Sequence, residues 1–334
     1  MANLISIIVP VHNGGKTIGS CLEAALASKY ADFEVIVVDD GSDDNSIDII
    51  KNFPCKLIQL PEHSGASRAR NIAASEAQGD ILFFTDADCL LEEDTLAVAY
   101  KTLRSAGPKV VIGGTYTRIP YDNNFFSRFQ SIFINHFETK RAENPNYVAT
   151  HAMIINADTF RDNSGFNEQF LPIIEDVEFS HRLRRHGYKL TINPEIQVRH
   201  IFNFSLSKSL LNALRKSMYW TIYSIRNKDL LVDSGTASIE LKTNVVSFFS
   251  IAMLLLIYLL VEQAILLPII ILAIGVNVSV NWRLFQAFYR TGGWLFSIGA
   301  LIYYLLLYPL AVGMGAIGGA LKYFKILFKE RVNT

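Results

Sequence analysis

The stretch Ile81-Leu-Phe-Phe-Thr-Asp-Ala-Asp88 decides the fold. Residues 81–85 have the apolar character of a strand that is covered on both faces, as in a parallel sheet. Two carboxylates follow directly, and side chains two positions apart in extended chain point the same way. We expect Asp86 and Asp88 to face one ligand. Hard cations such as Mg²⁺ and Mn²⁺ are often held by one or two carboxylates together with substrate phosphates.

Strands and helices alternate over the first hundred residues. The predicted strands are Leu4–Val9, Glu34–Val38, Lys56–Leu60 and Ile81–Thr85, and the predicted helices are Thr17–Ser28, Asn45–Phe53 and Ser67–Glu76. This alternation predicts an α/β fold with a mostly parallel, Rossmann-like sheet and helices on both faces. Ligands of such sheets bind beyond the carboxyl ends of the strands, where the acidic clusters lie.

Two further clusters near the N-terminus are candidates for substrate binding. Asp39 and Asp40 end the second strand; they can hydrogen-bond a base or ribose, and they also suit a turn and helix cap. Arg70 lies in the first turns of a helix, where backbone N–H groups and arginines suit a diphosphate. The first strand is followed by 10–15, Pro-Val-His-Asn-Gly-Gly, and lacks the G-x-G-x-x-G pattern of dinucleotide-dependent dehydrogenases.

Later in the chain, Glu175 and Asp176 precede a predicted helix, Val177–His186. Acidic residues are common in any first helical turn, and an ionised carboxylate there can also act as a general base. His200 is a candidate metal ligand or phosphate contact, although a single histidine is more often structural. The formal net charge is zero, with 31 basic and 31 acidic residues, so no basic field indicates nucleic acid.

The C-terminal part is strongly apolar. Residues 244–321 contain three candidate transmembrane segments, 245–261, 264–280 and 294–321. Residues 203–243 are expected to form an amphipathic helical linker, in which 205–226 predict a basic amphipathic helix that either lies on the membrane or packs on the globular domain. The basic tail 322–334 favours a cytoplasmic C-terminus. If the N-terminal domain is cytoplasmic too, the number of crossings must be even, and three segments break that rule. Either one segment is re-entrant or interfacial, or the tail lies outside.

Residues 4–202 resemble family 2 glycosyltransferases with the GT-A fold. The resemblance rests on ordered motifs, namely Ile7–Asn13, Val37–Ser42, Ala69–Asn71, Thr85–Asp88 and Glu175–Glu178. It implies a GT-A domain over 1–202, followed by an α-helical membrane region. It also implies site residues: Pro10, Val11, Asn13, Asp39, Asp40, Arg70 and Asp86 for the donor, Asp86, Asp88 and His200 for Mg²⁺ or Mn²⁺, and Asp176 as base with Glu175 beside it.

The function implied by this resemblance is inverting transfer of a sugar from a nucleotide-sugar, with UDP as the family-level expectation. The expected acceptor is a hydroxyl of a lipid-linked or membrane-associated glycan in cell-envelope or exopolysaccharide synthesis. We expect a multi-pass protein of the cell (inner) membrane with a cytoplasmic catalytic domain. Polymerising members carry Gln-x-x-Arg-Trp, whereas this chain has Asn-Ala-Leu-Arg-Lys at 212–216, which favours single-sugar transfer. The alternatives are a polyprenyl-phosphate glycosyltransferase and a non-catalytic scaffold that binds nucleotide-sugars.

Overall fold

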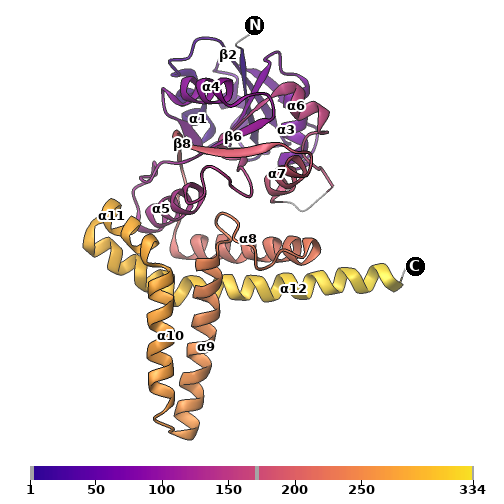
Figure 1. Ribbon diagram of the computed structural model, residues 1–334. Coiled ribbons are helices and arrows are strands. Elements are labelled where there is room, and N and C mark those ends of the chain that lie inside the picture. The colour runs from indigo at the N-terminus through magenta and orange to yellow at the C-terminus, as the bar shows by residue number, and fades with distance from the viewer. Residues whose placement is uncertain (1–3, 170–172, 333–334) are drawn as a thin grey trace. The chain divides into compact units, whose positions relative to one another are not determined.

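The computed structural model describes residues 4–169 and 173–332 of the 334-residue chain. The chain divides into two compact units (Figure 1). The first comprises Met1–Asn123 and Phe137–Asn203, and the second comprises Asn124–His136 and Phe204–Thr334. Residues 124–136, which the sequence places in the first domain, therefore group with the C-terminal helices.

The first unit is built on one eight-stranded sheet with the order β3-β2-β1-β4-β7-β6-β8-β5. The strands are β1 (Ile5–Val11), β2 (Phe33–Asp39), β3 (Lys56–Gln59), β4 (Ile81–Phe84), β5 (Cys89–Leu91), β6 (Val110–Tyr116), β7 (Met153–Asn156) and β8 (Lys189–His200). The first four are mutually parallel, as the alternating pattern predicts. Strand β7 runs antiparallel to β4 and β6, and β5 runs antiparallel to β8, so the later half is mixed.

Helices cover the sheet, and one large apolar core lies beneath three of them. The helices of this unit are α1 (Ile18–Leu26), α2 (Ser46–Ile50), α3 (Ala66–Ser75), α4 (Thr95–Ala106), α6 (Ala157–Asp162) and α7 (Glu175–Arg185). Ile8 and Phe84 of the sheet belong to a buried cluster with Ala69 of α3, Phe160 of α6 and Phe179 of α7. Helices α1 and α4 lie on the opposite side in Figure 1. The predicted α/β fold is confirmed.

Strand register brings the acidic motifs to one edge of the sheet. Val11 at the end of β1 pairs with Asp39 at the end of β2. On the other side of β1, Phe84 of β4 pairs with Ile8, and the backbone N–H of Thr85 donates to the Ile8 carbonyl. The residues after β4 therefore emerge beside the end of β1, where parallel sheets bind ligands.

The second unit is helical. It contains most of α5 (Phe125–Thr139), then α8 (Leu206–Asn227), α9 (Ile239–Val261), α10 (Leu266–Val280), α11 (Trp282–Ile302), a π-helical segment (Tyr303–Leu307) and α12 (Tyr308–Val332). Helices α9 and α10 form a hairpin, and α8 and α12 lie side by side across its base (Figure 1). Helix α5 packs through aromatic side chains, because buried Phe129 contacts Phe288 and Tyr303.

Helices α8 and α12 approach closely because of two glycines four residues apart. A Cβ atom added at Gly315 would lie 2.3 Å from the Leu214 carbonyl oxygen, and one at Gly319 would lie 2.4 Å from that of Met218. Any larger residue would push the helices apart, as in small-residue contacts between membrane helices. The sequence predicts that the amphipathic helix lies either on the membrane or on the globular domain. In the structure, the buried face of α8 packs on α12.

A buried polar network holds the π-helical segment. Asn244 of α9 donates to the Tyr304 carbonyl at 2.7 Å, and Asn277 of α10 donates to the Asn244 side chain at 2.9 Å. Asn281 donates to Asn277, and the Tyr304 hydroxyl donates to Asn281. A π-helical turn interrupts the regular ladder of backbone hydrogen bonds, and the Asn244 amide donates to one carbonyl of this turn, that of Tyr304.

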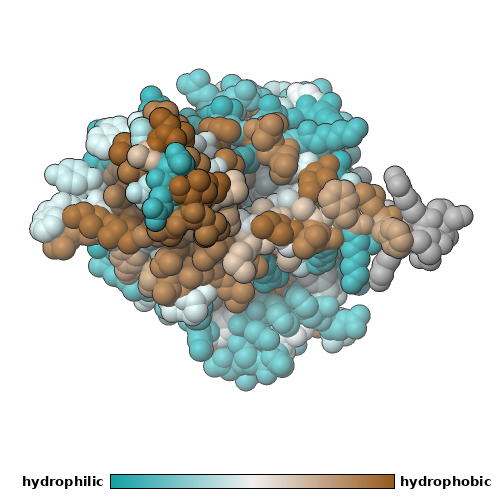
Figure 2. Space-filling model, turned by 90° about the horizontal axis from the view of Figure 1, so that it is seen from below, coloured by the Kyte–Doolittle hydropathy of each residue, from teal (hydrophilic) through white to brown (hydrophobic). Residues whose placement is uncertain are grey.

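Two described helices are long and apolar enough to cross a membrane: Ile239–Val261 and the kinked helix Trp282–Lys325. Leu266–Val280 is apolar but shorter. Exposed leucines and isoleucines cover the hairpin, with Leu259 and Leu260 more than 70% exposed. Figure 2 shows these apolar side chains gathered on one face. The predicted segments 245–261 and 264–280 match α9 and α10, whereas 294–321 lies inside a longer helix with a non-helical residue, Gly293, and the π segment.

Candidate active site

Asp39 and Asp40 have different environments although they are adjacent and both buried. The Asp40 carboxylate accepts hydrogen bonds from the backbone N–H groups of Ser64 and Gly65, at 2.7 and 2.8 Å, and lies 2.9 Å from His63 Nδ1. It therefore ties the loop before α3 to β2. Asp39 Oδ2 accepts from the Ser42 N–H, but Oδ1 is buried with no hydrogen-bond partner among residues 4–169 and 173–332. A buried orphan acceptor is costly, so Asp39 Oδ1 is the atom poised for a ligand.

The residues after β1 hold this edge together through their backbone. The Asp40 N–H donates to the Val11 carbonyl at 2.7 Å. Asn13, whose φ is +54°, donates its N–H to Ser42 Oγ and accepts from the Asp43 N–H. Pro10 is partly buried at the end of β1. The structure thus brings the predicted donor residues of the first two strands together in one loop cluster.

Arg70 is the link between the acidic motifs. It is buried in the second turn of α3, and its guanidinium donates to Asp86 Oδ1 and to Glu175 Oε1, both at 2.6 Å. Burial raises the pKa of Asp86, the Arg70 charge lowers it, and the net shift is downward. Asp86 therefore stays ionised. The sequence predicts that Arg70 lies near a diphosphate. In the structure, its two terminal nitrogens donate hydrogen bonds to carboxylates.

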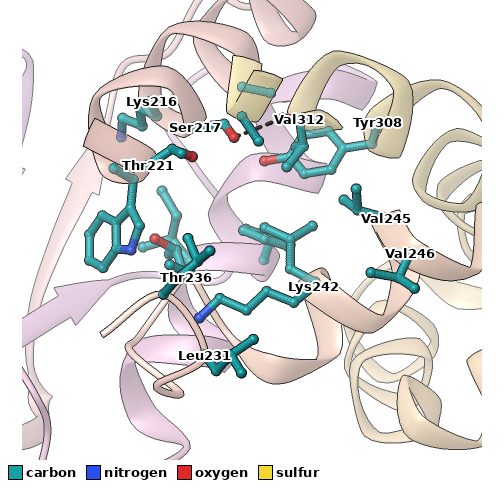
Figure 3. Close-up of a pocket in the computed structure, with 18 of the residues that line it drawn as sticks. Lys216, Ser217, Thr221, Leu231, Thr236, Lys242, Val245, Val246, Tyr308 and Val312 are labelled. Carbon is teal, nitrogen blue, oxygen red and sulfur yellow. Dashed lines mark hydrogen bonds between the residues drawn. The ribbon is translucent and has the colours of Figure 1, made fainter. Parts of the chain in front are cut away.

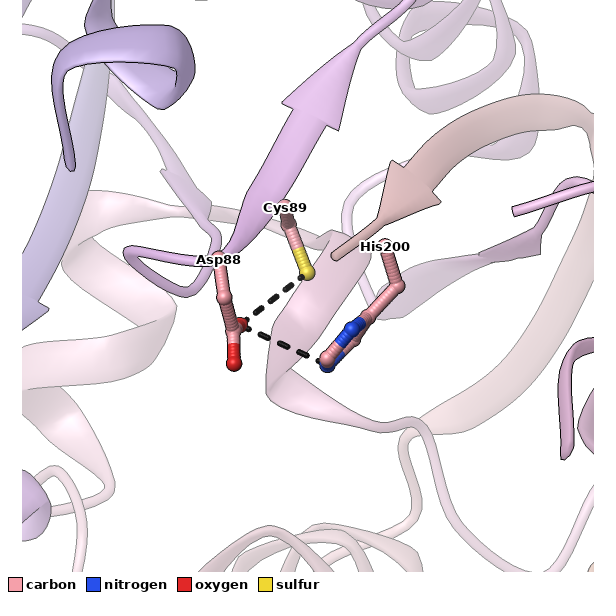
Figure 4. Close-up of side chains that lie close together, drawn as sticks. All are labelled: Asp88, Cys89 and His200. Carbon is pink, nitrogen blue, oxygen red and sulfur yellow. Dashed lines mark hydrogen bonds and ion pairs between the residues drawn. The ribbon is translucent and has the colours of Figure 1, made fainter. Parts of the chain in front are cut away.

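Asp88 lies apart from this ion pair, in a group with Cys89 and His200 (Figure 4). One ligand atom from each of the three residues lies within 4.8 Å of the others, and Asp88 Oδ1 is 3.4 Å from His200 Nε2. The antiparallel pairing of β5 with β8 sets Cys89 opposite His200. Of the three predicted metal ligands, the structure thus brings Asp88 and His200 together, whereas Asp86 is held by Arg70.

The chemistry of this group fits a hard divalent cation. The Asp88 side chain is 42% exposed, so its oxygens are accessible to a substrate phosphate. Its carboxylate is a ligand type that suits Mn²⁺ or Mg²⁺, whereas the His200 imidazole is more typical of a transition metal such as Mn²⁺. Cys89 is fully buried, and burial raises its pKa well above the usual value. A protonated thiol is a poor ligand, so Asp88 and His200 are the residues that would hold the ion.

Asp176 stands in the first turn of α7 beside Glu175. Burial and the Glu175 charge raise its pKa to about 7, although its carboxylate accepts from the Val177 N–H at 2.8 Å. A general base works best with a pKa near the operating pH. The residue before the helix, Ile174, has φ of +72°, which is rare for a β-branched side chain. Such strain is typical of positions that surrounding structure fixes for function.

A buried histidine that no sequence motif indicates acts on these carboxylates. His151 lies 3.5 Å from the Glu138 carboxylate and stacks on Tyr116, and Glu138 also accepts from Thr115 Oγ1. Burial lowers the pKa of His151. The negative charges of Glu138, Asp86 and Asp176 raise it by more, so the net shift is upward. The upward shift favours the protonated imidazole, whose charge opposes that of the nearby carboxylates. No motif signals it, since its partners come from distant segments.

Comparison with known proteins relates part of this chain to a described family. The family model "Glycosyl transferase family 2" matches residues 6–159. Glycosyltransferase GlyG of Streptococcus pneumoniae serotype 4 is 34% identical over 38% of this chain and 44% of its own length. Glycosyltransferase AglE of Haloferax volcanii is 28% identical over 58% of this chain and 65% of its own. The chain thus spans less than two thirds of the length of these curated relatives.

A solved structure has a related fold. The mannosyltransferase PcManGT from Pyrobaculum calidifontis, in complex with GDP-Man and Mn²⁺, aligns with a TM-score of 0.57 and 17% identity, over 96% of this chain and 86% of that one. At this identity the likeness concerns the fold. Residues 6–159 thus match the model of glycosyltransferase family 2, and the fold of the chain resembles that of this solved glycosyltransferase.

Proposed function

We propose that this protein is a nucleotide-sugar-dependent glycosyltransferase that transfers one sugar, with inversion, to a hydroxyl of a membrane-associated acceptor. The observation that carries the proposal is the chain of side chains Asp86–Arg70–Glu175, which ties the acidic motif after β4 to the first turn of α7, where Asp176 stands. Donor groups and a base with a pKa of about 7 are thereby fixed at one edge of the sheet.

Each group has a role in this reaction. Asp39 Oδ1 accepts a hydrogen bond from the nucleoside, because it is buried and has no partner of its own among the described residues. Asp88 and His200 would hold the divalent cation, which when bound neutralises charge on the diphosphate. Asp176 takes the proton of the acceptor hydroxyl. The acceptor oxygen then forms its bond to the anomeric carbon as the bond from that carbon to the diphosphate breaks.

The base favours a hydroxyl acceptor over a lipid phosphate. A phosphate oxygen is already anionic and needs no deprotonation, whereas a hydroxyl does. The pKa of about 7 for Asp176 suits proton abstraction at neutral pH. The polyprenyl-phosphate reaction therefore stands second. UDP as the nucleotide and cell-envelope or exopolysaccharide synthesis as the pathway rest on family resemblance.

The second unit supports a membrane location with two crossings. At about 1.5 Å per residue, the 23 residues of α9 extend about 35 Å and the 15 residues of α10 about 22 Å. The hydrocarbon core of a membrane is about 30 Å thick. Helix α9 is long enough to cross it, and helix α10 covers most of it. Helix α12 lies along α8, and not along the hairpin (Figure 1). An interfacial α12 gives an even number of crossings and leaves both catalytic domain and tail cytoplasmic.

The function is tested by a transfer assay on the purified full-length protein. It would be offered labelled nucleotide-sugars of several types, with Mn²⁺ or Mg²⁺ and a membrane lipid extract, and label in the lipid phase would be measured. We expect label from one donor class only, lost on replacing Asp176 with Asn. Tight donor binding without transfer to any lipid would instead support the non-catalytic scaffold.

A further inference from the structure

The second unit contains a cavity that the catalytic proposal does not use. It has a volume of about 320 Å³, within the range of small-molecule sites. Helices α5, α8, α9 and α12 and the connection 228–238 surround it (Figure 3). Its walls are mainly apolar, with Phe133, Trp220, Val245 and Val312 among them. An apolar cavity of this kind suits hydrocarbon better than a water-soluble ligand.

The cavity reaches the surface at an apolar rim. Leu230, Leu231 and Val232 are consecutive and exposed, Leu231 by 80%, and the two leucines line the cavity. Val245 and Val246 on the opposite side belong to the start of the apolar stretch of α9. A rim that is continuous with a membrane-length helix lets a hydrocarbon chain enter without crossing water.

Two lysines line the cavity, and the carboxylates of Asp233 and Asp229 lie near enough to Lys242 to act on its charge. Lys216 of α8 is exposed and forms no ion pair among the residues that the structure describes. Lys242 of α9 is half-buried, and its ammonium donates to the Val232 carbonyl at 2.5 Å. Figure 3 shows both side chains at the cavity, Lys242 reaching toward the 228–238 connection. Lysines at the end of a membrane helix keep their charged group at the interface, where lipid phosphates lie.

We propose that this cavity binds the hydrocarbon chain of a phosphate-headed lipid, with Lys216 and Lys242 facing the phosphate. The apolar walls match the chain, and the two cations match the head. If the glycosyltransferase function proposed above holds, the occupant is the lipid carrier of the acceptor glycan, whose sugar hydroxyl is extended. The lipid site itself depends only on the cavity.

The test is photolabelling of the purified full-length protein by a diazirine-bearing hexadecyl phosphate, followed by peptide mapping. We expect label on the peptides that contain Trp220, Leu231 and Val246. Ala316 lines the cavity, and Ala316→Phe should reduce labelling tenfold or more by filling it. The matched control is Ile317→Phe, one residue along α12, where the side chain is 58% exposed and does not line the cavity.

A charge reversal on the surface of α8 keeps the test decisive if Ala316→Phe fails to fold. Lys216→Glu should weaken labelling about tenfold, because each basic residue near an anionic lipid surface contributes an attraction that the change turns into repulsion. Arg215→Glu alters the net charge equally at a neighbouring exposed position that does not line the cavity. Equal labelling of both variants and their controls would overturn the site.

Competition identifies the occupant. Suppression of labelling by polyisoprenyl phosphate but not by phosphatidylglycerol supports the acceptor carrier, whereas equal suppression by both keeps the site and overturns the carrier assignment. Donor turnover is measured in the same samples. Turnover without labelling refutes the lipid site alone, and labelling without turnover refutes the proposed function alone.

Discussion

Replacing Asp176 with Asn separates catalysis from stability in one variant. The amide keeps the shape of the side chain and can still accept from the Val177 N–H, but it cannot take a proton from an acceptor hydroxyl. Loss of a general base typically costs 10²–10⁴-fold in rate, so we expect transfer to fall by about that factor. For the wild type, we expect the rate to rise with pH through about 7, because only the ionised carboxylate is active.

The same variant should be more stable than the wild type at alkaline pH. The folded-state pKa of Asp176 is raised from 3.8 to about 7, so the folded protein binds this proton more tightly than the unfolded chain. Stability from this group is therefore fully present below 3.8 and is lost as pH rises toward 7. The interval corresponds to an upper limit of roughly 4 kcal/mol, since one pH unit is about 1.4 kcal/mol.

Asp176 is partly exposed, and water screening reduces this limit to about 1–2 kcal/mol. We expect the apparent Tm of Asp176→Asn to exceed that of the wild type by about 2–8 °C at pH 8, with the difference vanishing near pH 4. Thermal unfolding of the purified protein measures it, with the exposed Asp158→Asn as control. Transfer within threefold of wild type would refute the base assignment, and an unchanged or lower Tm at pH 8 would refute the burial argument.

Three further predictions follow from the contacts. Arg70→Met should lower the free energy of unfolding by about 3–5 kcal/mol, since it leaves two carboxylates unpaired; a chemical denaturation series that shows under 1 kcal/mol would contradict the bridge. Gly315→Val should cost about 1–3 kcal/mol through its clash with α8, and a wild-type Tm would contradict the close contact. With two crossings, a membrane-impermeant maleimide added to intact cells should label Gln263→Cys, between α9 and α10, but not Lys322→Cys; labelling of both would mean an odd number of crossings.

Much of the fold follows from the sequence for a simple reason. A continuous apolar run such as Ile81–Phe84 is typical of a strand that is covered on both faces of the sheet. The structure agrees, because β4 is buried throughout. The acidic residues after it are then confined to the carboxyl edge of the sheet by the parallel register. Gly315 and Gly319 likewise encode a close helix contact through the size of their side chains.

The parts that sequence could not provide are long-range pairings. Arg70 meets Glu175 across 105 positions, and no local pattern specifies that partner. Adjacent Asp39 and Asp40 look equivalent as a motif, yet one holds a loop and the other keeps an oxygen without a partner in the part of the chain that is described. The grouping of residues 124–136 with the C-terminal helices depends on aromatic contacts made by Phe129 with Phe288 and Tyr303, which are equally remote.

The central claim, that the sheet edge turns over a nucleotide-sugar, is tested most directly by release of nucleoside diphosphate from the EDTA-treated protein after Mn²⁺ is added back. We expect release from one donor class, restored by Mn²⁺, and strongly reduced in Asp88→Asn although the protein remains folded. Release that is equal in Asp88→Asn and the wild type, or no release from any donor despite lipid extract and metal, would contradict it.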